Sequence, residues 1–340
     1  MNKLKKFIRV LETSVATASF LIFLLMIITK VLGFIKLRAI AQFFGVSKEL
    51  DVFWAAFAIP DLIFTLLIAG TVNAALVPIF IKVKTKEGHK KVLEVLNSVV
   101  NFNIVLWFAI WAILYVLSPV VVKGLFSLAS KPWVPMFFKG TIYYDKEYID
   151  LFIKMTRMLF FSPFLLGISS IFTAFLNSYK RFTIASLAPL MYNVGIVLSV
   201  YVLMAIVPNW GVWILVISVI VGSIFHLLVQ LPLIFELGYR FKPVFRFTKY
   251  VKDMIVLSVP RILGLAVEQI AITFDTFWSL FLGAGALSIF KYASSLQIMP
   301  VHLFGNSILQ ATFPSLNEHV AKNGKGEKFV NMFLKIFPVV

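Results

Sequence analysis

Long apolar segments separated by short polar and basic stretches dominate the chain. A helix needs roughly 20 apolar residues to cross a bilayer, and about nine segments meet that requirement. They lie near residues 14–40, 51–81, 92–118, 151–176, 185–207, 211–235, 253–282, 287–316 and 329–340. The pattern therefore predicts an all-α polytopic membrane protein.

The composition agrees with this prediction. Hydrophobic residues make up 60% of the 340 residues and charged residues only 14%, whereas about a quarter of a soluble domain is charged. A net charge of +17 would point to nucleic acid in a soluble protein. Here the cations lie mostly in short loops between apolar segments, so we expect no nucleic-acid partner.

The distribution of these cations predicts the topology. If the N-terminus is cytoplasmic, the inner segments hold 19 Lys and Arg residues and the outer loops hold 5. Lys and Arg accumulate in the cytoplasmic loops of membrane proteins. We therefore expect a multi-pass protein with a cytoplasmic N-terminus, whose first apolar segment is a retained helix rather than a signal peptide.

An internal repeat is also visible. The phrase Lys30-Val-Leu-Gly-Phe resembles Arg261-Ile-Leu-Gly-Leu, 231 residues later, and the next apolar segment of each copy contains a proline, Pro60 or Pro300. Parallel repeats of this kind indicate two similar lobes around a central cavity.

The repeat predicts the division of the chain. We expect residues 1–240 to form an N-terminal lobe of six helices and residues 241–340 to form part of a C-terminal lobe with about three helices. Two complete lobes would need about 460 residues, so the second lobe is expected to be truncated.

Charged side chains inside the apolar segments are the candidates for function, because each costs at least a few kcal/mol there and usually faces a cavity. They are Lys30, Lys36, Arg38, Asp61, Arg261, Glu268, Asp275 and Lys291. Arg38 lies close enough to the outer end of its segment to extend its side chain to the interface. Lys30 has apolar turns on both sides, so we expect it, and also Lys36, to face a cavity.

The acidic candidates allow more than one role. Arg261, Glu268 and Asp275 recur every seven residues and so lie on nearly one helix face. This stripe is either an ion-pair ladder to neighbouring helices or a functional surface. Asp61 follows Pro60, where a carboxylate could hold water, a proton or a lysine. Asp51 begins an apolar segment, a common place for a helix N-cap.

Nothing in the sequence indicates an enzyme. The chain has no cysteine, and no metalloprotease, hydrolase, Walker or dinucleotide-binding motif occurs in a usable context. We expect no metal and no cofactor. His226 and His302 stand alone within apolar segments and are interpreted as hydrogen-bonded packing residues.

Several phrases resemble one known family. They are KVLGFIKLRAIAQFFG, ELDVFWAAFAIPDLIFTLLIAGTVNAALVPIF, QLPLIFELGYR and VPRILGLAVEQIAITFDTFWSLFLGAGALSIF. Together they resemble the MurJ (MviN) lipid II flippases of the multidrug/oligosaccharidyl-lipid/polysaccharide exporter superfamily. The resemblance implies movement of undecaprenyl-diphosphate-linked peptidoglycan precursor from the inner to the outer leaflet of the bacterial cell membrane by alternating access.

The resemblance also implies roles for particular residues. Lys30 and Lys36 occupy positions where the family has cavity arginines that meet the substrate's diphosphate, and Asp51 occupies an acidic family position. Lys291 lies about one turn from a further cavity-arginine position, and Arg261 opens the second copy of the repeat. These five residues are the predicted substrate-binding set, while Asp61, Glu268 and Asp275 are assigned to proton or ion handling or to structure.

The partners implied are a lipid-linked diphosphate saccharide, membrane lipids and peptidoglycan-synthesis proteins. Two alternatives remain open: a flippase for another lipid-linked polysaccharide, and a non-transporting membrane scaffold. A polyprenyl-phosphate transferase would need clustered acidic metal ligands, which the sequence lacks.

Overall fold

A computed structural model describes residues 15–66, 75–129, 146–243 and 248–300. Every regular element in these ranges is a helix. The chain divides into two compact units, residues 1–289 and 290–340, so the first unit contains most of the described residues. The predicted helix at 329–340 lies outside the described residues, as do His302 and the second half of the predicted segment 287–316.

The helices follow the predicted apolar segments closely. In chain order they are α2 (Val15–Phe44), α3 (Lys48–Phe64), α4 (Val77–Ala129), α6 (Lys146–Leu159), α7 (Phe161–Ser178), α8 (Phe182–Ile206), the 3-10 turn η3 (Pro208–Trp210), α9 (Trp213–Leu228), α10 (Leu231–Glu236), α11 (Lys249–Leu280) and α12 (Ala286–Pro300). Each of the first eight predicted segments overlaps one or two of these helices.

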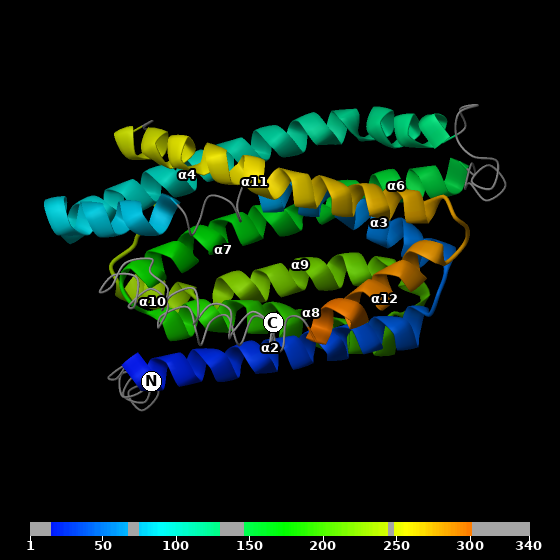
Figure 1. Cartoon of the computed structure of the whole chain (residues 1–340), viewed down its shortest axis with the longest axis horizontal. Coiled ribbons are helices and arrows are strands. Elements are labelled where there is room, and N and C mark those ends of the chain that lie inside the picture. The colour runs from blue at the N-terminus through cyan, green and yellow to red at the C-terminus, as the bar shows by residue number, and fades with distance from the viewer. Residues whose placement is uncertain (1–14, 67–74, 130–145, 244–247, 301–340) are drawn as a thin grey trace, which may run out of the picture. The chain divides into compact units, whose positions relative to one another are not determined.

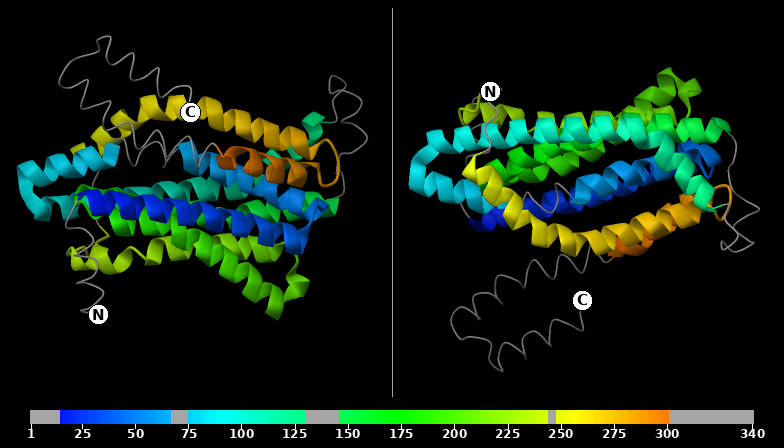
Figure 2. Two further views of the ribbon diagram at one scale, coloured as in Figure 1. Left: turned by 60° about the horizontal axis from the view of Figure 1, so that its bottom comes forward. Right: turned by 90° about the horizontal axis from the view of Figure 1, so that it is seen from above.

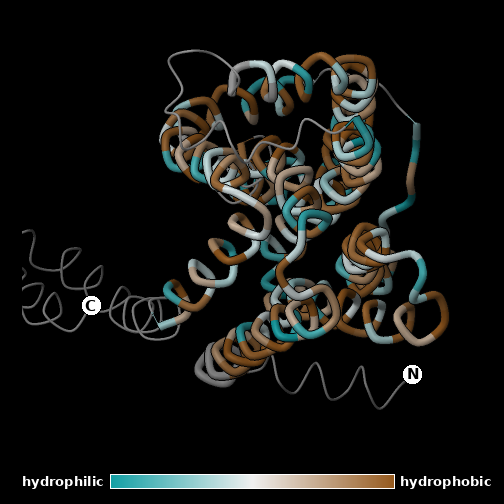
Figure 3. The backbone as a smooth tube through the Cα atoms, turned by 90° about the vertical axis from the view of Figure 1, so that its right-hand side faces the viewer, coloured by the Kyte–Doolittle hydropathy of each residue, from teal (hydrophilic) through white to brown (hydrophobic). Residues whose placement is uncertain are grey.

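Hydrophobic residues predominate along the helices (Figure 3). Four described stretches are long and apolar enough to cross a membrane, Val77–Leu125, Lys146–Ser178, Phe182–Ile206 and Trp213–Glu236, and α11 becomes a fifth if its two bent halves count as one span. Large apolar side chains are widely exposed, among them Ile206 at 71% and Val267 at 75%. Such a surface suits lipid rather than water, so the chain is a multi-pass membrane protein.

The predicted connection between two spans contains a sharp turn. The basic stretch 82–91 was expected to separate two spans, and it does so at Gly88, a non-helical residue where the two helical halves of α4 meet. Gly88 has φ +80°, a conformation that glycine adopts without a steric penalty, and α4 turns back on itself there (Figure 2). The exposed lysines of this stretch therefore lie on a helical hairpin, which holds them more firmly than a loop would.

Within the first unit, the helices lie side by side along one direction (Figure 1). Helix α8 packs against α2 and α9, α7 packs against α4 and α9, and α3 packs against α6 and α11. The main apolar core lies around α4 and α7 and includes Phe80, Trp107 and Phe175. Polar side chains join the same helices: the Ser169 hydroxyl on α7 lies 2.6 Å from Nδ1 of His226 on α9. The interpretation of His226 as a hydrogen-bonded packing residue is confirmed.

Helices α8 and α9 approach each other most closely at two glycines. A Cβ atom added to Gly195 would lie 2.9 Å from the Cα of Gly222, and one added to Gly222 would lie 2.8 Å from the carbonyl oxygen of Tyr192. Backbones come this close only where small residues face each other, as is common between membrane helices. This contact fixes the backbone of Tyr192 on α8 against α9.

We predict that Gly222→Ala lowers the stability of the protein by about 1–3 kcal/mol, because the added methyl group overpacks the contact between α8 and α9. The change is read as a lower melting temperature in thermal unfolding of the detergent-purified chain. Gly124→Ala is the control, since nothing lies within 4 Å of a Cβ there. Equal melting temperatures for the two variants would show that the contact is not tight.

Candidate functional site

Asp51 lies in the first turn of α3. The Ser47 hydroxyl accepts a hydrogen bond from the amide of Leu50 at 3.2 Å and so starts the helix. This leaves the Asp51 side chain available for a distant partner. The residue is fully buried, at 0% exposure.

The partners of Asp51 come from the segment that begins α12. Its Oδ2 accepts a hydrogen bond from the amide of Gly285 at 2.6 Å, and its Oδ1 accepts from the amide and the hydroxyl of Ser288 at 2.7 and 2.6 Å. The donors lie at a helix N-terminus, where a negative charge is stabilised. Hydrogen bonds to an ionised group are short and strong. Asp51 therefore holds the start of α3 firmly against a segment 234 residues later in the chain.

Gly285 is held in a conformation suited to this contact. Its φ is +82°, and a side chain at this position would collide with Val46. Only glycine satisfies both conditions without strain. The turn before α12 is therefore shaped to present its amides to Asp51.

The cations of α2 lie in different environments. Helix α2 is continuous through Gly33, so Lys30 and Lys36 stay on different faces. Both are half-buried, whereas Arg38 is exposed. The ammonium nitrogen of Lys36 lies 5.7 Å from the ring centre of Tyr192 on α8, a geometry in which the ring face attracts a cation.

Asp61, on α3, interacts with groups on α8 and α11. Its Oδ2 accepts a hydrogen bond of 3.4 Å from Nε2 of Gln269 on α11, and the carboxylate lies within electrostatic range of Tyr192. Thus α2, α3, α8 and α11 each contribute one polar group, namely Lys36, Asp61, Tyr192 and Gln269. We call these four residues the interior polar cluster.

Sequence reasoning identified only half of this cluster. Lys36 and Asp61 were found because a charge inside an apolar segment is conspicuous. Tyr192 and Gln269 were missed, since an aromatic residue and a neutral amide cost much less in such a segment. The mid-helix position of Gln269, next to Glu268, was the one available signal.

The remaining candidates are not drawn into the cluster. Glu268 and Asp275 on α11 are exposed, and within the described residues neither has an ion-pair partner. The side chain of Arg261 lies outside what the structure describes. Lys291 belongs to the second compact unit, is half-buried, and its carbonyl oxygen accepts a hydrogen bond from the Ser295 hydroxyl at 2.7 Å.

Comparison with known proteins identifies the family. The family model described as "Lipid II flippase MurJ" matches residues 40–339. The chain belongs to this family. Its fold agrees, since a solved structure of lipid II flippase MurJ in an inward closed conformation superposes with a TM-score of 0.69 at 20% identity, covering 90% of this chain and 60% of that chain.

Two curated MurJ relatives show how much of the family protein is represented. The probable lipid II flippase MurJ of Buchnera aphidicola subsp. Acyrthosiphon pisum is 28% identical over 303 residues, covering 88% of this chain and 56% of its own length. Lipid II flippase MurJ of Burkholderia cenocepacia is 29% identical over 301 residues, covering 86% of this chain and 55% of its own. The chain spans just over half the length of these relatives.

We predict that Asp51→Asn lowers the stability of the detergent-purified chain by about 1–3 kcal/mol. The asparagine NH2 group would face a backbone N–H, which leaves a buried donor without an acceptor. Thermal unfolding measures the change. Asp150→Asn, at an exposed position on α6, is the matched control, and equal melting temperatures for both variants would contradict the buried contact.

Proposed function

We propose that the chain takes part in moving lipid II from the inner to the outer leaflet of the bacterial inner membrane by alternating access. The proposal rests chiefly on the family match across residues 40–339. The relatives named as lipid II flippases MurJ support the choice of substrate. In this proposal the N-terminus is cytoplasmic, as the distribution of Lys and Arg predicts, and peptidoglycan-synthesis proteins deliver and use the substrate.

The cations of α2 supply the physical reason for an anionic substrate. A lysine inside a membrane-spanning helix costs about 2.5–3.5 kcal/mol even on the insertion scales that give the lowest values. Lys36 is only half-buried and has an aromatic ring, rather than a carboxylate, as its described neighbour. Its positive charge is thus left for a ligand, and the diphosphate of lipid II is a ligand of matching charge.

Lys30 is proposed to act with Lys36. Because α2 is continuous, the Cα atoms of the two lysines lie six residues, or roughly 9 Å, apart along the helix axis. One flexible diphosphate-sugar headgroup can meet both in turn. Lysine binds phosphate as a point charge and lacks the bidentate fork of arginine, so it holds the headgroup less rigidly.

Asp51 is proposed to act as a latch rather than as a direct substrate contact, because both of its oxygens are already occupied. Alternating access requires the segments that close one side of the cavity to separate. The Asp51 contact to Gly285 and Ser288 is directional and made by few atoms, so it can break as a unit. The lipid tail would remain in the bilayer while only the headgroup crosses.

We predict that Lys36→Ala abolishes the ability of the chain to sustain growth of a strain depleted of its own lipid II flippase, at matched protein level, and that Lys30→Ala does the same. Losing one charged contact to a phosphate lowers the affinity for the substrate about tenfold or more. Lys36→Arg should retain function because it keeps the charge. Lys154→Ala, at an exposed position on α6, is the control.

Two results would contradict the proposal. Normal growth with Lys36→Ala and with Lys30→Ala would show that the α2 cations are not needed to bind the substrate. Rescue of a strain lacking a different lipid-linked polysaccharide flippase, but not of the lipid II strain, would assign another saccharide.

A further inference from the structure

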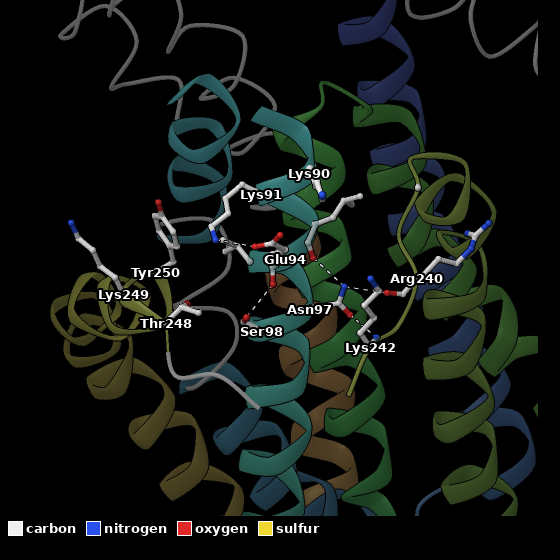
Figure 4. Close-up of a pocket in the computed structure, with 13 residues that line it drawn as sticks. Lys90, Lys91, Glu94, Asn97, Ser98, Arg240, Lys242, Thr248, Lys249 and Tyr250 are labelled. Atoms are coloured by element: carbon white, nitrogen blue, oxygen red, sulfur yellow. Dashed lines mark hydrogen bonds and ion pairs between the residues drawn. The ribbon is translucent and has the colours of Figure 1, made fainter. Parts of the chain in front are cut away.

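A cavity of about 590 Å³ lies at the end of the bundle that the charge distribution predicts to be cytoplasmic. Three segments far apart in the sequence surround it: the part of α4 after Gly88, the residues Gly238 to Lys242 that follow α10, and the first residues of α11 (Figure 4). It shares no residue with the interior polar cluster.

The side chains around this cavity are strongly basic. Five cations line it, namely Lys90, Lys91, Arg240, Lys242 and Lys249, against the single carboxylate of Glu94. Lys91 and Glu94 form an ion pair of 2.9 Å. Among the described residues, the other four cations have no carboxylate within ion-pair distance. The guanidinium of Arg240 already donates to the carbonyl oxygens of Phe235 and Tyr239, so the uncompensated positive charge of the cavity comes mainly from Lys90, Lys242 and Lys249.

Buried amides fix the basic chain segment in place. The side chain of Asn97, only 7% exposed, donates to the carbonyl of Arg240 at 3.1 Å and accepts from the amide of Lys242 at 2.9 Å. Asn101, one turn further along α4, donates to the carbonyl of Lys242 at 2.6 Å. These bonds hold two of the cations beside α4 by their backbones, so the cavity is not formed by a loose loop.

The remaining wall also favours an anion. Helix α11 begins at this cavity, with the hydroxyl of Thr248 accepting from the amide of Val251 at 3.4 Å, and the free amides of a helix N-terminus attract negative charge.

We propose that this cavity binds the phosphate headgroup of an anionic phospholipid of the inner leaflet. Basic pockets on the cytoplasmic side of membrane helices suit such headgroups. Leu93 and Val95 also line the cavity, and they give the glycerol and upper acyl region of a lipid an apolar contact. A soluble phosphate would gain nothing from that apolar wall. The bound headgroup would bridge α4 and the start of α11.

The test is titration of the detergent-purified full chain with phosphatidylglycerol, with bound lipid counted by native mass spectrometry. Each lysine near an anionic headgroup contributes about a factor of five to binding. The double variant Lys90→Gln, Lys242→Gln should therefore bind phosphatidylglycerol about 25-fold more weakly. Phosphatidylcholine, which has no net charge, should bind weakly and equally to both proteins.

The control is Lys123→Gln, Lys146→Gln, which removes two exposed lysines from the end of the bundle predicted to face outward. Its affinity for phosphatidylglycerol should equal that of the unmodified chain. An equal loss in both double variants, or no loss in either, would overturn the proposal. Displacement of phosphatidylglycerol by millimolar inorganic phosphate would also overturn it, since the site would then recognise free phosphate rather than a lipid.

Discussion

The first unit depends on a carboxylate that has no access to solvent. Burying an unpaired charge is prohibitively costly in an apolar environment, so Asp51 is tolerated there only because Gly285 and Ser288 supply three hydrogen bonds. These bonds bring the start of α3 against the segment that begins α12. Further along α3, Asp61 meets Gln269 of α11. Two polar contacts thus position α3 against helices from much later in the sequence.

The packing elsewhere has a different physical character. Helices α8 and α9 meet backbone to backbone at Gly195 and Gly222, and such a contact is made of many small dispersion terms that are lost only when the helices separate widely. The α3 contacts consist of a few directional bonds that can be broken together. The proposed alternating access needs both kinds of contact, because rigid groups of helices must move relative to one another. The difference fits a movable boundary along α3 and a rigid α8–α9 pair that carries Tyr192.

The sequence predicted the helices well because their apolar segments are long. It did not predict the position of the turn at Gly88, a residue of positive φ at which the two helical halves of α4 meet. Charge alone was enough to find Lys36 and Asp61, whereas Asp51 was chosen because it occupies an acidic family position. Their partners could not be predicted, since Gly285, Ser288, Tyr192 and Gln269 are distant in sequence and unremarkable in type. The seven-residue spacing of Glu268 and Asp275 correctly predicted a shared helix face, but spacing does not reveal whether such a face meets another helix, and both residues are exposed.

The central claim is that the α2 cations recognise a lipid-linked diphosphate, and the most direct test is equilibrium binding by the detergent-purified chain. Lipid II should bind at least about tenfold more tightly than undecaprenol, which carries the same tail without the diphosphate and sugar. Undecaprenyl diphosphate should also bind much more tightly than undecaprenol. In the Lys36→Ala variant, most of this difference in affinity should be lost. Equal affinities of the unmodified chain for undecaprenol and undecaprenyl diphosphate would contradict the claim.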